Sequence, residues 1–465
     1  MGGSVISSEM GRPVIMTLTK QGGVLMNAGQ KLIITETEPT PIVKDFTAFA
    51  AYVEKKEILL TKARGWLPRQ DLLAINALMT EPEQEVTVYS DQNAYPLLAL
   101  FYNLALVADL FRMEPHSSGK QTLLPTERLS VFYSLNPTEK YISLLEALWV
   151  DTDWSDLMID YDRAPSADEV RAVFELLAEL PPGSVVDDSS DFGKQLILRL
   201  RRWGHIVYCF QYFGFWAMTR NEAPLLSYVS KFAYPIKTLA PTPLFYSLCM
   251  ELYRSRDLEL WNLHLRQEAG DWAGFPGEPL WEDEDAGEDA DEAQGEDEGE
   301  EEWEMENFAD SLIHLFPAGE LTRWLPRQII EFVDCTYVLK VTLRRNCWRR
   351  IRLSSHCTLY DLHQAIQDAF DFGDDHLYAF FMDGKKWSTK FVFYSPDDTD
   401  RPTVTEAYLG ELELSVGQKF LYLFDFGDEW AFTVTVEDIQ AVDTREEQPQ
   451  VIESRGQAPE QYKDD

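Results

Sequence analysis

Apolar residues recur at helical spacing along the first third of the chain. Phe46, Phe49 and Val53 would share one face of a helix. Cap residues and apolar stretches predict further helices at four places: after Pro68, over 95–111, after Pro125 and after Asn136. Residues 1–42 show little periodicity and are expected to be poorly ordered. The pattern predicts a helical domain over residues 43–160.

The next stretch, residues 161–280, combines helices with a strand pair. The expected order is two helices over 167–180 and 191–203, β-prone segments over 205–210, 213–218 and 235–239, and a helix from about Pro243. Two helices followed by a ribbon outline a winged helix, with Arg199, Arg201 and Arg202 on its would-be recognition helix. DNA contact is one interpretation of these arginines. The other is a helical packing domain with surface charges, which the acidic surroundings favour.

A highly acidic tract separates this region from the C-terminal part. Apart from Ala, Gly and one Gln, residues 282–302 are all Asp or Glu. Such a run repels itself and has nothing to bury, so residues 281–306 are expected to form a disordered, solvated linker. A tract that binds a partner or mimics a nucleic acid is the alternative interpretation.

From Tyr337 the hydrophobic period switches from helical to two. A helix over 308–330 is expected to precede the sheet, and a helix should start at Thr358. Strands are expected over 337–343, 348–353, 376–382, 419–424 and 430–436. Residues 307–465 should therefore form an α+β domain with one helix across its sheet, similar in outline to a β-grasp.

Composition and charge narrow the function classes. The chain has 465 residues, of which 45% are hydrophobic, so it is not wholly disordered. Its 79 acidic and 41 basic residues give a net charge of -38, which excludes a generally basic nucleic-acid coat. The five cysteines include no CxxC pair, and no apolar run approaches the roughly 20 residues that span a bilayer. We expect a cytoplasmic protein with no membrane partner.

The C-terminal region also resembles a known family. The matching segments are YVLKV at 337–341, WRRI at 348–351, HLY at 376–378, YLFDFGDEW at 422–430 and the ending GQAPEQY at 456–462. Together they are similar to the plasmid pRiA4b Orf-three-like family, also labelled an insertion-element passenger family. The resemblance implies a domain without an agreed activity. Its passenger label implies only an association with mobile elements.

The triplet Asp425-Phe426-Gly427 also occurs in kinases, where it binds a metal ion. No glycine-rich loop or His-Arg-Asp loop accompanies it, so a kinase is excluded. A near-copy begins at Asp371. We interpret both as turns in which Asp bonds the backbone and Gly adopts a positive φ.

A metal site is a sharper hypothesis. Two imidazoles and two carboxylates, those of His363, His376, Asp425 and Asp428, could bind a divalent metal and activate water for hydrolysis. No ligand spacing such as His-x-x-x-His supports it. The favoured interpretation is structural, with His363 a core-edge histidine bonded to a backbone carbonyl. A cofactor is expected only under this hypothesis.

The densest positive patch lies around Trp348, in the arginines Arg344, Arg345, Arg349, Arg350 and Arg352. Trp348 beside arginine could stack on a base or hold an acidic peptide. Alternatively, the arginines pair with local carboxylates or with the acidic linker. Asp425, Asp428 and Trp430 are further candidate binding residues.

The sequence thus favours a non-enzymatic cytoplasmic adaptor or regulator that binds a macromolecular partner, either protein or nucleic acid. The alternative is a metal-assisted hydrolase or nuclease that uses the His/Asp set.

Overall fold

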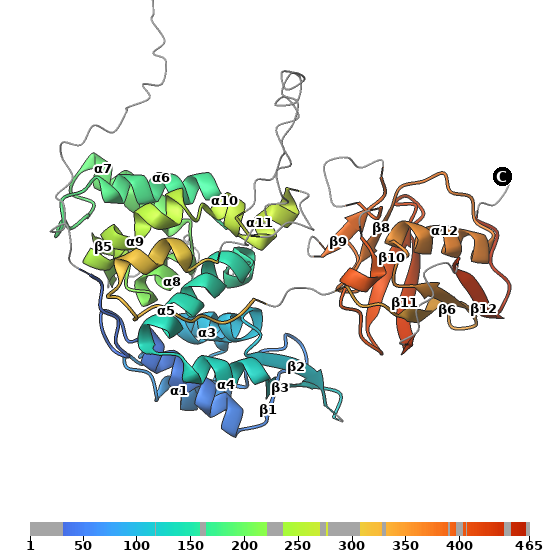
Figure 1. Cartoon of the computed structure of the whole chain (residues 1–465), viewed down its shortest axis with the longest axis horizontal. Coiled ribbons are helices and arrows are strands. Elements are labelled where there is room, and N and C mark those ends of the chain that lie inside the picture. Colours follow the sequence, from blue (N-terminus) through green and yellow to red (C-terminus); the bar gives the residue numbers. More distant parts are fainter. Residues whose placement is uncertain are drawn as a thin grey trace, which may run out of the picture.

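The described residues form two large hydrophobic cores and a small third cluster of Ala379, Phe381, Val392 and Leu423 in the C-terminal sheet. The two large cores belong to the two folded parts of the chain that Figure 1 shows. The computed structural model describes residues 31–116, 118–158, 164–220, 236–269, 276–277, 307–327, 332–388, 391–396, 403–405, 407–440 and 448–461. The first core extends from Ile34 to Leu325 and the second from Cys335 to Val436. Both contain helices and antiparallel sheet, so the expected α+β class is confirmed. Most of residues 1–42 and the whole of 281–306 lie outside the described ranges.

The first core begins with five helices, all of them expected from the sequence. These are α1 (Ile42–Lys55), α2 (Arg69–Asn76), α3 (Pro96–Val107), α4 (Glu127–Ser134) and α5 (Pro137–Glu146). Phe46, Phe49 and Val53 are buried on one face of α1, as their spacing predicts. In α5 the side chains of Asn136 and Glu139 satisfy each other's backbone N–H groups in a capping box.

The expectation that residues 43–160 are all helical is wrong, because a small antiparallel sheet interrupts them. Its strands β1 (Ile58–Leu59), β2 (Phe111–Pro115) and β3 (Gln121–Pro125) lie in the order β1-β3-β2. Helix α3 ends before Asp109, which has a left-handed φ of 48°, and the chain reverses near Gly119, with φ 74°. The apolar stretch 95–111 therefore spans a helix end and the start of a strand.

In the second part of the first core, the described residues form six helices and a ribbon. Its elements are α6 (Ala167–Ala178), α7 (Asp191–Arg201), α8 (Ile206–Tyr212), β4 (Trp216–Arg220), β5 (Ile236–Pro241), α9 (Pro243–Arg254), α10 (Leu258–Trp261) and α11 (Leu263–Glu268). The expected strand over 205–210 is wrong, because these residues form the buried helix α8. A continuous apolar run has no alternation of polar residues, so its period does not distinguish a buried helix from a strand.

Helix α8, not α7, directly precedes the β4–β5 ribbon. It packs against α3, and Ile206 to Phe210 are all buried. Val186, in the loop between α6 and α7, forms an isolated antiparallel bridge with Leu239 of β5. The three arginines at 199–202 lie at the end of α7, away from the position of a recognition helix before the ribbon.

The helix expected over 308–330 is also wrong. Residues 310–315 form a short 3-10 helix, a turn follows at 317–320, and residues 322–327 have no regular secondary structure; we call residues 307–327 the strap. Residues 328–330 of the expected helix lie outside the described ranges. Pro317, Gly319 with φ 87°, and Pro326 interrupt helical geometry. The strap packs into the first core. We expected it to be part of the C-terminal domain, and this expectation is wrong. Its buried residues are Phe308, Leu312, Phe316, Leu321 and Leu325.

Both described ends of the acidic tract contact this same core. The backbone N–H of Gly277 donates to the carbonyl of Leu260 (2.9 Å). After the tract, the buried guanidinium of Arg256 donates to the carbonyls of Asn307 (2.7 Å) and Phe308 (3.0 Å). The tract therefore leaves and rejoins the first core, and the connection between the two cores is the short stretch after Arg327.

Ion pairs hold the far end of the strap. Arg327 donates to Glu146 at the end of α5 (2.8 Å) and also pairs with Asp151. Residues Ala147–Asp151 form a π-helical turn that aims both carboxylates at the strap. Burial raises the pKa of Glu146 from 4.5 to about 7, more than the Arg327 guanidinium lowers it.

This carboxyl should make stability depend on pH. Because its pKa is higher in the folded than in the unfolded chain, the stability it contributes is full below pH 4.5 and is lost as the pH rises through about 7. Between pH 5 and 8 this carboxyl should lower the free energy of unfolding of the wild type. Glu146→Gln lacks the titrating group, so its free energy of unfolding should fall by about 2 kcal/mol less over the same range. Urea unfolding at a series of pH values measures this. Glu127→Gln, at an exposed carboxylate, is the control, and an unchanged pH slope in Glu146→Gln would contradict the assignment.

The second core is built on a seven-stranded antiparallel sheet with the order β12-β7-β6-β11-β10-β8-β9. The strands are β6 (Thr336–Arg344), β7 (Cys347–Ser354), β8 (Tyr378–Phe381), β9 (Val392–Tyr394), β10 (Lys419–Phe424), β11 (Trp430–Gln440) and β12 (Gln450–Arg455). Helix α12 (Leu359–Phe370) lies across one face (Figure 1). The expected hairpin, the helix capped by Thr358 and the β10–β11 pair are confirmed.

Two strands were not expected. Strand β9 has three residues, and every residue of β12 is exposed, so neither shows an alternating pattern. The five cysteines are free. In the described ranges, no helix has the length and apolar character that crossing a membrane requires.

Candidate functional site

Four loops meet where several strands of the C-terminal sheet begin or end. We call this end of the sheet the loop edge. They are the β6–β7 turn, the α12–β8 loop, the β10–β11 loop and the segment after β12. The strand register brings them together, because Phe424 pairs with both Tyr378 and Trp430. Gln461 ties two of the loops, accepting from the N–H of Gly373 (2.5 Å) and donating to its carbonyl (3.2 Å).

Asp425 shapes the β10–β11 loop. Its buried carboxylate accepts hydrogen bonds from the N–H groups of Gly427 (2.9 Å) and Asp428 (3.2 Å). The expected turn with an Asp-to-backbone bond is therefore present. The residue with the left-handed conformation, however, is Asp425 itself, with φ 54°, and not Gly427. In the near-copy, Asp371 also has a left-handed conformation, with φ 58°. Asp tolerates this conformation because its short side chain bonds the local backbone.

The four residues of the metal hypothesis do not converge on one point. His376 lies 3.7 Å from Asp425 and 3.6 Å from Asp375, all near the loop edge. His363 is fully buried, and both of its ring nitrogens are engaged elsewhere. Across the residues that the structure describes, no group of three or more His, Cys, Asp or Glu side chains is placed to hold a metal ion.

His363 belongs to a buried polar chain that joins α12 to the sheet. Its Nδ1 is 2.7 Å from the Tyr422 hydroxyl and its Nε2 is 2.9 Å from Asp374. The Gln367 amide donates to the same hydroxyl (2.7 Å), so the hydroxyl proton points to Nδ1 and Nε2–H donates to Asp374. Burial lowers the pKa of His363, which keeps the ring neutral. His363 is thus a core histidine, bonded to side chains where a backbone carbonyl was expected.

The Tyr422 hydroxyl of this buried hydrogen-bond network cannot reach a substrate. Tyr422 is fully buried, and the His363 ring stacks on Tyr378 with centroids 3.7 Å apart. The geometry supports fixation of the helix on the sheet.

Arg349 acts inside the domain. It is 7% exposed and its guanidinium lies 4.5 Å from the ring centroid of Phe370. It donates to the carbonyl of Ala369 (2.7 Å) at the end of α12 and to those of Arg455 and Gly456 (both 3.2 Å) at the end of β12. One side chain thereby joins the helix, β7 and the C-terminal segment.

The other face of the β6–β7 hairpin is covered by charged side chains of the hairpin and of the neighbouring strands β11 and β12. Arg350 pairs with Glu437 and Glu453. Lys340 and Arg350 both lie over the ring of Trp348, at 4.7 and 5.0 Å from its centroid, and that residue is 8% exposed. The ring of Trp348 therefore has no open face on which a base could stack.

Arg344 and Arg345 are exposed in the hairpin turn, and Arg352 bonds the side chain of Gln450 (2.8 Å). Neither of the two turn arginines has an ion pair with another described residue. Trp430 is half-buried, with its ring edge against Phe372 at 5.0 Å between centroids.

Sequence reasoning missed Trp387. This residue is 50% exposed and has a left-handed φ of 60°. Its ring lies against Phe426 (5.1 Å between centroids), and its indole N–H donates to Glu429 (3.2 Å). Glu429 also has a left-handed φ, 54°, and pairs with Lys386. The only sequence signal was a lone Trp in a polar loop, where no hydrophobic period exists.

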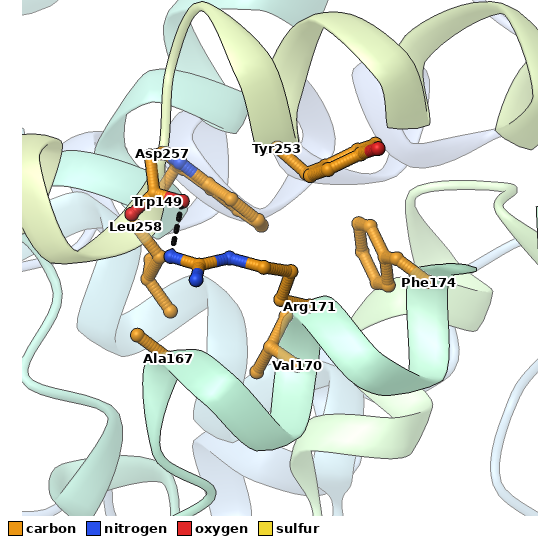
Figure 2. Close-up of a pocket in the computed structure, with 8 residues that line it drawn as sticks. All are labelled: Trp149, Ala167, Val170, Arg171, Phe174, Tyr253, Asp257 and Leu258. Carbon is orange, nitrogen blue, oxygen red and sulfur yellow. Dashed lines mark hydrogen bonds and ion pairs between the residues drawn. The ribbon is translucent and has the colours of Figure 1, made fainter. Parts of the chain in front are cut away.

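The first core offers little for a small molecule. Figure 2 shows a small pocket between α6 and the α9–α10 region. Its charged groups neutralise each other, because Arg171 pairs with Asp257 (2.7 Å). The remaining lining is mostly apolar: Trp149, Ala167, Val170, Phe174, Tyr253 and Leu258.

Comparison with known proteins finds a family that the C-terminal domain resembles. Residues 335–462 match the family model described as plasmid pRiA4b ORF-3-like protein. The C-terminal region is similar to this Orf-three-like family. A crystal structure of a protein of unknown function from Methanosarcina mazei Go1 matches with 28% identity over 27% of this chain and 72% of that chain, with a TM-score of 0.23. No curated protein matches.

Four of the five segments named for the family resemblance lie at or beside the loop edge of the C-terminal domain. They are the start of β7, the residues before β8, the β10–β11 loop and the segment after β12. The fifth, at 337–341, lies within β6.

Proposed function

We propose that this protein is a non-enzymatic adaptor that binds a protein partner beside the loop edge of the Orf-three-like domain. The binding surface consists of Trp387, Phe426, Asp428 and Glu429, and we call it the Trp387 surface. The observation that carries the proposal is the half-exposed Trp387, held in a left-handed conformation by the neighbouring loop. Such a conformation costs about 1 kcal/mol or more for a bulky residue, and residues of this kind cluster at binding sites.

The chemistry of this surface suits a cationic side chain. An exposed indole attracts ammonium or guanidinium groups through its ring face, and tryptophan is enriched among the residues that dominate binding energy. Asp428 is exposed and has no ion-pair partner among the residues described. A net charge of -38 draws a basic partner and repels phosphate backbones. We therefore propose a protein segment that carries Arg or Lys, in preference to nucleic acid.

We also propose that residues 167–241 are a winged helix used for packing. The order α6, Val186 bridge, α7, α8, β4, β5 supports this topology. The helix before the ribbon, α8, would enter a DNA groove in a nucleic-acid-binding member. Here its burial against α3 is consistent with an internal packing role. The β-grasp likeness of the C-terminal domain stays a prediction.

Selection of a displayed peptide library on the full-length protein tests the Trp387 surface. We expect enriched peptides to carry Arg or Lys, and their affinity to fall at least about tenfold with Trp387→Ala, because one central aromatic contact contributes more than 1.4 kcal/mol. Affinity is measured by biolayer interferometry. Tyr408→Ala, at another exposed aromatic residue of the same domain, should leave binding unchanged. Enrichment of acidic peptides, or equal losses in both variants, would refute the proposal.

A further inference from the structure

Helix α7 presents an outward face that the packing of the first core leaves open. Gly193, Leu196, Ile197 and Leu200 point inward and are buried. Leu198 lies at the centre of the opposite face and is 58% exposed. In this position Leu198 gains little of the stabilisation that a buried leucine contributes to folding, and its side chain is accessible to a partner.

Cations surround this leucine. Lys194 and Arg202 lie four residues before and after Leu198, and Arg201 lies three residues after it, so all of them border it on the helix surface. Among the described residues, neither Arg199 nor Arg202 has a carboxylate partner. Positive charge near a helix C-terminus is favourable through the helix dipole, which explains the arginines but not the leucine between them.

A second apolar side chain extends the surface. Phe192, in the first turn of α7 on the side of Arg199, is 41% exposed. The ammonium of Lys194 lies 3.9 Å from the carboxylate of Asp191, so Arg199 and Arg202 supply the positive charge that is not paired within the described residues. Exposed apolar residues beside these two arginines form a surface that is both hydrophobic and positive, in a protein whose net charge is -38.

We propose that this α7 face, formed by Phe192, Lys194, Leu198, Arg199 and Arg202, docks an acidic amphipathic segment of a partner protein. Carboxylates of such a segment would pair with Arg199 and Arg202, and its apolar side chains would cover Leu198 and Phe192. A nucleic acid would leave the apolar side chains uncovered and would bring a dense row of phosphates towards an acidic protein. Charge complementarity and the apolar centre together favour a peptide.

The α7 face is independent of the Trp387 surface, since the two lie on different cores and have opposite charge preferences. A protein with both would hold an acidic and a basic partner at the same time.

Fluorescence anisotropy with the full-length protein tests the α7 face. The probe is a labelled 16-residue synthetic peptide with leucines at helical spacing and Glu or Asp between them. We expect binding that weakens about tenfold with Leu198→Ala and with the double variant Arg199→Gln/Arg202→Gln. Val131→Ala on α4 and Lys55→Gln at the end of α1 remove a similarly exposed apolar and a similarly placed basic side chain, so they should leave affinity unchanged.

Three results would overturn the proposal. The first is equal affinity for a scrambled peptide of the same composition, or no binding of the probe. The second is tighter binding of a 16-nucleotide single strand that shows the same losses in the α7 variants. The third is binding that appears only after the acidic residues of 282–302 are replaced by Gly and Ser, because the chain's own tract would then be the occupant.

Discussion

Replacing Arg349 by methionine is expected to destabilise the Orf-three-like domain by about 3 to 5 kcal/mol. Methionine can fill the space beside Phe370, but it cannot donate to the carbonyls of Ala369, Arg455 and Gly456. Hydrogen bonds made by a charged group contribute about 1.5 to 3 kcal/mol each, and those to the exposed residues Arg455 and Gly456 should lie at the lower end of this range. The loss should also separate α12 from the segment after β12, because Arg349 bonds both.

Hydrogen exchange measured by mass spectrometry on the full-length chain checks this prediction. Peptides from β7, α12 and β12 should exchange faster in Arg349→Met, while peptides from α1 and α5 in the other core should be unchanged. Arg345→Met, in the exposed turn of the same hairpin, should resemble the wild type. Unaltered protection of α12 in Arg349→Met would show that these bonds contribute little.

Gly456→Ala should destabilise the same domain by about 3 kcal/mol or more, through a steric conflict and backbone strain. A β-carbon at this position would lie 2.0 Å from the carbonyl oxygen of Asn346. The backbone φ of 77° is also unfavourable for alanine, at a cost of about 1 to 2 kcal/mol. Because Asn346 is in the β6–β7 turn, relief of the conflict requires β12 to move away from β7.

Gly417→Ala is the matched control for this variant. Gly417 has a φ of 91°, but a β-carbon added there would meet no described atom within 4 Å, so only the strain cost of about 1 kcal/mol remains. Urea unfolding of both variants, with hydrogen exchange of residues 450–461, separates the two effects. Equal destabilisation in the two variants would mean that the approach of Asn346 is not limiting.

Elements with a regular period were predictable from the sequence. Helix α12 has a capping residue, Thr358, and buried residues at positions 359, 362, 366 and 370, so both its start and its inward face are specified locally. The β10–β11 pair alternates between the core and the other face along both strands. In each case the residues that determine the element lie within it.

Elements determined by distant contacts were not predictable. Helix α8 has no polar alternation, and the strap is held by Glu139 and Glu146 of α5, far away in sequence. At the candidate site, local turn chemistry indicated the bond from Asp425 to the backbone. The contact between Trp387 and Glu429 depends on two loops 42 residues apart, and no local pattern reports it.

The acidic tract connects two segments of the same folded unit, because Gly277 before it and Asn307 after it are both hydrogen-bonded to the first core. The entropy of closing such a loop grows only with the logarithm of its length, about 0.6 kcal/mol for each doubling. Length and composition in the tract can therefore change at small cost and without altering the spacing of the two folded units. That spacing depends instead on the few residues between Arg327 and the first strand of the sheet, where insertions and deletions would act directly.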